Sequence, residues 1–345
     1  MNFTKHRIFF RADGSSKIGL GHVVRCLALI EMLNRDFECI FLIKDADEKI
    51  KHLIERNCKL IELRSSDFDK EVLEVLNIVT GNDIVVLDGY CFNSKYQQSV
   101  KSKVSKLVMI DDKADQHYYA DLIINHGSSS IENKYSKELY TKVLVGFPYT
   151  LLRKEFLASA KLNRVITKVD TAFICMGGSD PFNITLKVLK ACIQCDFIKT
   201  IFVVTGSAYS NADELLSLIN EYKSVKKIFR EINVDAQRMV ELISMSDIAV
   251  SPASSVSLEI CSVKAGLLSG IVIDNQNTIH EELVHSECCI SIGDFNIASE
   301  NEIISCLEKL KNIETVNSMI RNQSKAIDGL SGERILVEFK ELIEC

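Results

Sequence analysis

The sequence lacks any apolar run approaching the roughly 18–20 residues that a membrane-spanning helix needs. We also expect no secretory signal, because the first seven residues lead directly into a short strand-like run at residues 8–10. The chain has no positive charge excess either: 41 Lys and Arg stand against 47 Asp and Glu, a net charge of −6. This balance argues against nucleic-acid binding through a broad basic field. We therefore expect no membrane or nucleic-acid partner and a cytoplasmic location.

The composition is that of an ordinary globular protein. With 47% hydrophobic and 26% charged residues, the chain is not dominated by disorder. Its 345 residues are enough for two domains. The 12 cysteines are scattered through apolar segments, which predicts reduced thiols in the core of a cytosolic protein.

Short runs rich in Ile, Val, Leu and Phe recur between amphipathic stretches. Their length and nearly continuous hydrophobicity are typical of buried parallel strands. In the first half, the predicted strands are residues 7–11, 39–43, 59–63, 84–87, 107–110, 122–124 and 143–145. In the second half they are residues 171–175, 201–204, 227–229, 248–250, 271–273 and 289–291, with helical patterns at 184–193, 212–219, 236–245 and 255–263.

Two such series in tandem predict an α/β protein with two Rossmann-like, doubly wound domains. We expect an N-terminal domain at residues 1–152, a polar linker at 153–168 and a C-terminal domain at 169–300. The remaining residues, 301–345, form a helical tail that we expect to pack back on the first domain. Two such domains facing each other create a cleft at the carboxyl ends of both sheets, where open α/β sheets bind ligands.

A polar, glycine-containing loop at residues 11–25 follows the first predicted strand and opens the first helix. Gly14, Gly19 and Gly21 allow a tight turn and a close approach of the backbone to a ligand. A dinucleotide fingerprint is disfavoured, because position 24 is Val rather than Gly or Ala and the loop is too long.

His22 lies in the first turn of that helix, where the positive helix end disfavours imidazolium. A neutral histidine at the mouth of a cleft is a suitable general base. The alternative is a histidine that only forms local hydrogen bonds, and residue type alone favours neither. Gly21 beside it and Arg25 one turn later favour the catalytic interpretation.

Two further turns follow strands of the second domain. Gly177 and Gly178 leave backbone N–H groups free for an oxyanion, before a helix that we expect to begin at Pro181 and to be capped by Ser179 or Asp180. Near residue 254, small residues enter a helix whose N-terminus can hold a pyrophosphate, with Glu259 placed to reach ribose hydroxyls. Each turn alone also suits ordinary helix capping.

Together these residues resemble the UDP-sugar hydrolases of pseudaminic acid biosynthesis, in the GT-B superfamily beside the MurG-type N-acetylglucosaminyltransferases. The first loop matches the signature Arg-x-Asp-x-Ser-x-x-Ile-Gly-x-Gly-His-x-x-Arg of these hydrolases. The resemblance covers roughly residues 7–290 and continues through residues 88–90, 110–112, 120–125, 146–149, 152–156, 175–178, 251–259 and 275–276. The Ala-Ser-Ser form at residues 253–255 is more similar to the hydrolases than to the transferases.

The resemblance implies hydrolysis of UDP-2,4-diacetamido-2,4,6-trideoxy-β-L-altropyranose, with water replacing UDP and no cofactor. It places the catalytic base on His22. It implies UDP contacts from Gly177, Gly178, Ser254, Ser255, Glu259, Asn275 and Gln276. We assign sugar-binding or supporting roles to Arg11, Asp13, Gly21, Arg25 and Tyr90. Two other functions stay open: a MurG-like glycosyltransferase and a non-catalytic nucleotide-sugar sensor.

Several carboxylates also end predicted strands. Of Asp13, Asp88, Asp111 and Asp112, we favour only Asp13 for orienting His22 or holding the sugar and expect the others to be solvated. We predict no metal site. The Asp-x-Asp at residues 45–47 favours helix capping, and His280 and His285 diverge by about 140° on a helix.

Overall fold

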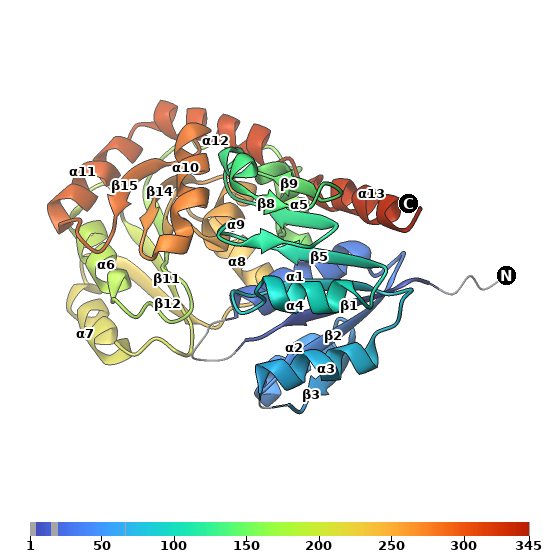
Figure 1. Ribbon diagram of the computed structural model, residues 1–345. Helices are drawn as coiled ribbons and strands as arrows, with labels where there is room; N and C mark the ends of the chain where they lie inside the picture. Colours follow the sequence, from blue (N-terminus) through green and yellow to red (C-terminus); the bar gives the residue numbers. More distant parts are fainter. Residues whose placement is uncertain (1–4, 15–19, 66, 345) are drawn as a thin grey trace. The chain divides into compact units, whose positions relative to one another are not determined.

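The computed structural model describes residues 5–14, 20–65 and 67–344 (Figure 1). The chain forms two compact units, one of Met1–Lys154 with Leu330–Cys345 and one of Glu155–Gly329. Of the expected tail, residues 301–329 therefore belong to the second unit and the remainder to the first. The expected linker contains helix α5 (Lys154–Ala160).

The first unit is built on a seven-stranded parallel sheet in the order β3-β2-β1-β4-β5-β7-β9. Its strands are β1 (Arg7–Ala12), β2 (Glu38–Lys44), β3 (Lys59–Leu63), β4 (Ile84–Asp88), β5 (Lys106–Ile110), β7 (Leu122–Asn125) and β9 (Lys142–Val145). A small second sheet pairs β6 (His117–Tyr118) with β8 (Ser136–Lys137). The short 3-10 helices are η1 (Ser129–Lys134) and η2 (Phe147–Tyr149).

Both faces of this sheet are covered by helices, as alternating side chains of β1 show. Phe10 packs in a core with α1 (Gly21–Leu33), α2 (Glu48–Glu55) and α13 (Ser331–Glu344). Phe9 packs in the opposite core with α3 (Phe68–Ile78) and α4 (Ser94–Lys101). Strands buried on both faces explain the nearly continuous apolar runs.

The second unit has a six-stranded parallel sheet in the order β12-β11-β10-β13-β14-β15. Its strands are β10 (Thr171–Cys175), β11 (Thr200–Thr205), β12 (Lys227–Ile232), β13 (Ile248–Pro252), β14 (Gly266–Ile271) and β15 (Ile290–Asp294). The helices are α6 (Ile184–Gln194), α7 (Ala212–Tyr222), α8 (Ala236–Ser244), α9 (Ser255–Val263), α10 (Asn277–His285), α11 (Glu300–Leu310) and α12 (Ile313–Ala326), with η3 (Asp274–Gln276) as a 3-10 turn.

The predicted α/β class with parallel sheets is confirmed, and one strand was predicted in the wrong place. The sequence pattern placed it at residues 271–273, but β14 begins at Gly266 and ends at Ile271. Two glycines lower the apparent strand propensity of this segment. Gly270 is required there, because a Cβ atom would lie 2.5 Å from the carbonyl oxygen of Gly293 on β15.

The cysteines in the described part of the chain are free thiols, and most are buried. Burial raises the pKa of the Cys175 thiol to about 12, so it stays protonated at neutral pH. Among the described residues, no helix combines the length and the apolar character that crossing a membrane would require.

Candidate active site

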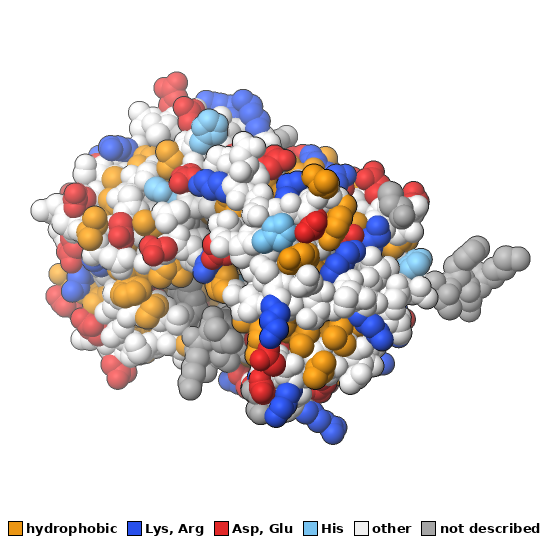
Figure 2. Space-filling view, in the orientation of Figure 1, with side chains coloured by type: hydrophobic (Ala, Val, Ile, Leu, Met, Phe, Trp, Pro, Cys, Tyr) orange, Lys and Arg blue, Asp and Glu red, His pale blue; other side chains and the backbone are white. Residues whose placement is uncertain are grey.

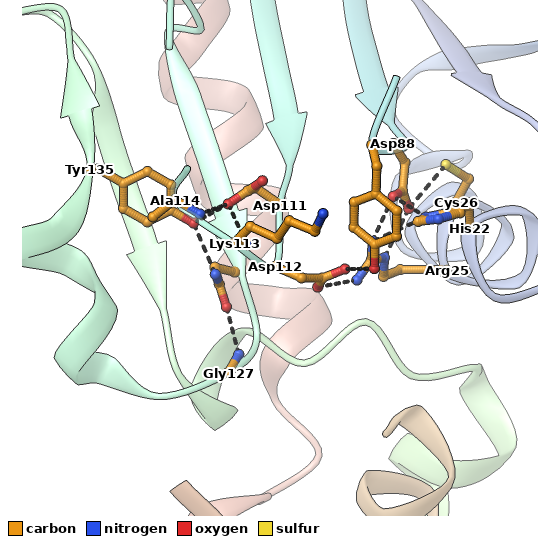
Figure 3. A network of polar contacts seen from close by, with 12 residues as sticks. His22, Arg25, Cys26, Asp88, Asp111, Asp112, Lys113, Ala114, Gly127 and Tyr135 are labelled. Carbon is orange, nitrogen blue, oxygen red and sulfur yellow. Dashed lines mark hydrogen bonds and ion pairs between the residues drawn. The ribbon is translucent and has the colours of Figure 1, made fainter. Parts of the chain in front are cut away.

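His22, the second residue of α1, points towards the carboxyl end of β4 (Figure 3). Its Nδ1 lies 2.7 Å from Oδ1 of Asp88, the fully buried last residue of β4. An ionised carboxylate only accepts hydrogen bonds, so Nδ1 carries the proton. The lone pair of Nε2 is then available to accept a proton.

Arg25 lies one helical turn after His22 and joins two carboxylates. Its Nε and Nη2 donate to the two oxygens of Asp88 at 2.8 and 2.6 Å, and its Nη1 donates to Oδ1 of Asp112 at 2.6 Å. Burial raises the pKa of the Asp88 carboxyl, but Arg25 and His22 outweigh burial and bring this pKa below its ordinary value. The pKa of Asp112 is lowered in the same way, chiefly by Arg25. Both carboxylates are therefore ionised at neutral pH.

Tyr90 lies against the same group of side chains. Its hydroxyl donates to Oδ2 of Asp112 at 3.1 Å, and its ring meets the His22 ring edge-on with centroids 5.0 Å apart. The Lys113 ammonium lies 4.4 Å from the Tyr90 ring centre. The structure thus brings together His22, Arg25 and Tyr90 from the sequence prediction, around Asp88 and Asp112.

Arg11 and Asp13 form a separate cluster. Arg11 is fully buried and donates to both oxygens of Asp13, at 2.5 and 2.8 Å, and to Oε1 of Glu71 at 2.9 Å. Asp88 rather than Asp13 contacts His22, so the expectation that Asp88 is solvated is wrong. Asp13 accepts hydrogen bonds from Arg11 and from the Lys44 N–H, and its role in holding the sugar stays a prediction. Strand β4 pairs with β1 and brings its last residue, Asp88, to the imidazole. Residues 15–19, including Gly19 of the predicted signature, lie outside the described residues.

Gly21 is the first residue of α1, and a Cβ atom there would meet no heavy atom of the described residues within 4 Å. This position therefore faces open space. A backbone without a side chain beside His22 is consistent with the close approach of a ligand that the sequence predicts.

Asp111 and Asp112, which follow β5, were also expected to be solvated, and this expectation is wrong. Asp111 is buried and accepts hydrogen bonds from the hydroxyl of Tyr135 and the N–H groups of Lys113 and Ala114, on the other side of the network in Figure 3. Burial raises the pKa of Asp111 above its ordinary value. Its hydrogen bonds anchor the loop that carries Asp112 and Lys113.

His126, the residue after β7, was not among the predicted site residues. Its side chain is buried, and within the described part of the chain its Nδ1 has no hydrogen-bond partner. Burial and the Arg25 charge lower the pKa of His126 to about 4. The sequence feature that could have pointed to His126 is its position directly after a predicted strand. That strand, β7, ends at the same edge of the sheet as β4 and β5.

The two weak metal motifs are structural. Asp47 caps α2 by accepting a hydrogen bond from the Ile50 N–H at 2.9 Å, which confirms the capping prediction. His280 on α10 lies with Nε2 2.8 Å from the Ser291 hydroxyl. Within the described ranges, no group of three or more His, Cys, Asp or Glu side chains could hold a metal ion.

In the second unit, the glycine turns after β10 and β11 lie against each other. Gly177 has a φ of +92°, which favours glycine, and a Cβ atom on Gly178 would have no atom of the described ranges within 4 Å. A Cβ atom on Gly206 would overlap the carbonyl group of Gly178. Close contact between the two turns therefore fixes where the Gly178 backbone lies.

The helix after this turn begins later than predicted. α6 starts at Ile184 rather than at Pro181, because Asp180 and Asn183 adopt positive φ angles of 37° and 54°. The carboxylate of Asp180 accepts from the N–H groups of Ile184 and Thr185, at 3.0 and 2.7 Å. Capping by Asp180 is thus confirmed.

Ser254 and Ser255 lie at the start of α9, and Glu259 lies one turn further in and is buried. The N–H of Ser254 donates to the hydroxyl of Ser257 at 3.2 Å. Asn275 and Gln276 lie in η3 after β14, where the Gln276 side-chain carbonyl accepts from the Val272 N–H at 2.7 Å. All the predicted UDP-contacting residues thus follow β10, β13 or β14, which are adjacent in one parallel sheet.

Acidic and basic side chains are interspersed over the face of the described residues that Figure 2 shows. This distribution agrees with the nearly balanced composition. It does not resemble the clustered Lys and Arg typical of a nucleic-acid interface.

No protein-family model matches the chain. An uncharacterized protein of Methanocaldococcus jannaschii is 32% identical over 255 residues, covering 71% of this chain and 51% of that protein. The chain thus matches about half the length of this relative. The UDP-2,4-diacetamido-2,4,6-trideoxy-β-L-altropyranose hydrolase of Campylobacter jejuni is 26% identical over 278 residues, covering 79% of this chain and 94% of the hydrolase.

Among solved structures, MurG of Acinetobacter baumannii superposes with a TM-score of 0.67 at 11% identity, covering 98% of this chain and 99% of MurG. Because the identity is so low, this similarity to MurG concerns the fold alone. The chain therefore has a GT-B-like fold, and its predicted sequence similarity to the UDP-diacetamido-trideoxy-altropyranose hydrolase is confirmed.

Proposed function

We propose that the protein is an enzyme acting on a UDP-sugar, and specifically that it hydrolyses UDP-2,4-diacetamido-2,4,6-trideoxy-β-L-altropyranose to UDP and the free sugar. The observation that carries this proposal is the contact between His22 Nδ1 and Asp88, which orients the ring and makes Nε2 the acceptor nitrogen of the neutral imidazole. The sequence similarity to the Campylobacter hydrolase supports the substrate. We assign the base to His22 and the nucleotide contacts to residues that follow β10, β13 and β14.

The reaction starts with a water molecule that donates its proton to Nε2 of His22 as its oxygen attacks the anomeric carbon. The bond between this carbon and the diphosphate oxygen breaks, and its electron pair leaves with UDP. Attack opposite the leaving group inverts the anomeric configuration. The imidazolium that forms is stabilised by the ionised Asp88.

The charge that develops on UDP is met by backbone N–H groups. We assign these N–H groups to Gly177 and Gly178 after β10 and to Ser255 at the N-terminus of α9. The N–H of Ser254 already donates to the Ser257 hydroxyl, so we assign Ser254 a UDP contact through its side chain. We assign the ribose to Glu259 and further UDP contacts to Asn275 and Gln276. UDP stabilised in this way is a good leaving group without a general acid, so we propose a metal-independent reaction.

The deciding measurement is an NMR time course with this UDP-sugar in water, without an acceptor. Hydrolysis predicts release of UDP and an inverted free sugar, and the rate should persist in a chelator. In water enriched in oxygen-18, the released UDP should stay unlabelled, because the bond to carbon is broken. Label in the β-phosphate would show cleavage at phosphorus and contradict the proposed mechanism.

His22→Ala should lower turnover by about 10²- to 10⁴-fold, the usual contribution of a general base. The affinity for UDP, measured by calorimetry, should not change. His52→Ala is the matched control, because this side chain of α2 is mostly exposed and its Nδ1 lies 3.4 Å from the Glu55 carboxylate. Wild-type turnover in His22→Ala would remove His22 as the base.

A glycosyltransferase is the second candidate, and the likeness of the fold to MurG favours it. The same base would then deprotonate a hydroxyl group of an acceptor instead of water. UDP release that depends strictly on an added acceptor would support this function. UDP-sugar binding with no turnover under either condition would indicate a sensor.

A further inference from the structure

His126 belongs to the same edge of the first sheet as the proposed base. Strands β1, β4, β5 and β7 are consecutive neighbours in that sheet. Their carboxyl ends carry His22 beyond β1, Asp88 on β4, Asp112 after β5 and His126 after β7. Adjacent strands are about 4.8 Å apart, so the ends of β4 and β7 are separated by roughly 10 Å. A monosaccharide fits a distance of this size.

The other polar side chains of this cluster are engaged with one another. His22 Nδ1 contacts Asp88, Arg25 donates to both carboxylates, and Tyr90 donates to Asp112. His126 differs, because its buried Nδ1 has no hydrogen-bond partner among the residues that the structure describes. A buried polar atom without a partner is costly, and such atoms are retained mainly where a ligand or water completes them.

The charge state of His126 indicates what kind of group it would bind. The charged groups that act on its ring are Arg25, Asp112 and Asp88, and burial together with Arg25 lowers its pKa to about 4. The ring is therefore neutral at pH 7 and offers one N–H donor and one nitrogen acceptor. This suits an uncharged hydroxyl or amide group and does not suit a diphosphate, which prefers cations or several N–H donors.

We propose that His126 is a substrate-binding and specificity-determining residue that hydrogen-bonds a hydroxyl or N-acyl group of the sugar. The inference rests on the proposed action on a UDP-sugar and assigns recognition of the sugar, as distinct from UDP, to this residue. His22 remains the base, and His126 binds the part of the substrate that UDP alone lacks.

The test compares His126→Phe, His126→Asn and His126→Gln in the full chain. Phenylalanine keeps the ring volume and removes both nitrogens, whereas the amide nitrogens of Asn and Gln replace Nδ1 and Nε2, respectively. His126→Phe should raise the KM for the UDP-sugar 10- to 100-fold and leave the Kd for UDP within twofold. One of the two amide variants should recover most of the loss, and the pH profile of kcat should keep its wild-type form.

Wild-type KM in His126→Phe would overturn the inference, as would an equal loss of affinity for UDP and for the UDP-sugar. If His126→Phe does not fold, the amide pair decides: a tenfold difference between the two supports the inference, and wild-type values for both overturn it. If the wild-type protein shows no turnover, hydrolysis fails as the proposed function. The ratio of the calorimetric Kd values for UDP and UDP-sugar then still tests His126.

Discussion

At the scale of single residues, the proposed role of His22 as a base depends on the net charge of the side chains around it. Two carboxylates, Asp88 and Asp112, share one guanidinium, that of Arg25. With His22 neutral, the group therefore has one excess negative charge, and proton uptake at Nε2 removes it. The excess negative charge therefore stabilises the imidazolium that forms as His22 accepts a proton in the transition state.

Replacing the carboxylate that orients His22 tests this arrangement. Asp88→Asn keeps the size of the side chain but no longer requires a proton on Nδ1, so turnover should fall by about 10²- to 10⁴-fold. UDP affinity should not change. Nitrogen-15 NMR of the histidines should show His22 protonated at Nδ1 in the wild type and at Nε2 in a large fraction of the variant. Equal tautomers in both proteins would contradict the role of Asp88.

His126 predicts a pH dependence of stability. Its pKa is about 4 in the folded protein, below the ordinary value of 6.5, so its contribution is fully present above pH 6.5. As the pH falls from 6.5 to 4, the unfolded chain takes up the proton first and the free energy of unfolding decreases, by about 3 kcal/mol.

The measurement is the slope of the free energy of unfolding against pH, from denaturant titrations of the wild type and His126→Phe. The variant should lack this part of the slope, whatever its absolute stability. Titration of the carboxyl groups is common to both proteins and cancels in the comparison. Parallel slopes between pH 6.5 and 4 would show that His126 is not held neutral in the folded state.

At the scale of elements, the glycine turns after β10 and β11 determine where the backbone meets UDP in our proposal. Gly206 is needed for the contact between the turns, whereas Gly178 faces open space. Gly206 is thus required by packing inside the protein, whereas in our proposal Gly178 is required by UDP. The same Gly→Ala change at the two positions separates these requirements.

Gly206→Ala should destabilise the protein by about 1–3 kcal/mol, because the new methyl group overlaps the neighbouring turn. Gly178→Ala should change stability by no more than about 0.5 kcal/mol, but it should weaken UDP binding at least tenfold. Denaturant titration and calorimetry measure the two effects. Unchanged UDP affinity in a stable Gly178→Ala protein would remove this glycine from the proposed nucleotide site.

At the scale of the whole molecule, the chain returns to its first unit at its end. Helix α13 packs against α1, where Ile335 and Phe339 are fully buried and Phe339 meets the ring of Phe37. Lys142 on β9 also pairs with Glu338 and Glu341 of this helix. The last helix therefore completes a core whose other buried side chains lie between Ile8 and Leu151, far earlier in the chain.

Phe339→Ala should lower the free energy of unfolding by about 3–5 kcal/mol, as expected for a large aromatic side chain removed from a core. Val337→Ala is the matched control on the same helix, because Val337 is exposed and its loss should cost no more than about 0.5 kcal/mol. Denaturant titration of both variants gives the comparison. Similar stabilities would indicate that α13 contributes little to the first unit.

The sequence by itself determined the local structure and the place of His22. Helix α9 has the predicted bounds, residues 255–263. The predicted helical pattern at residues 184–193 matches α6 to within one residue at its end, although this helix does not begin at Pro181 as expected. Such elements follow from apolar periodicity over a few residues, which is a property of the local chain. The position of His22 after a strand and a glycine-containing loop is local in the same sense.

Only the tertiary structure decided which carboxylate meets His22 and that His126 joins the cluster. Asp13 is nine residues from His22 and Asp88 is 66 residues away, yet the pairing of β1 with β4 brings the distant one to the ring. His126 is brought to the same edge by the pairing of β5 with β7. Strand order and burial depend on contacts between distant segments, and local periodicity carries no information about such contacts.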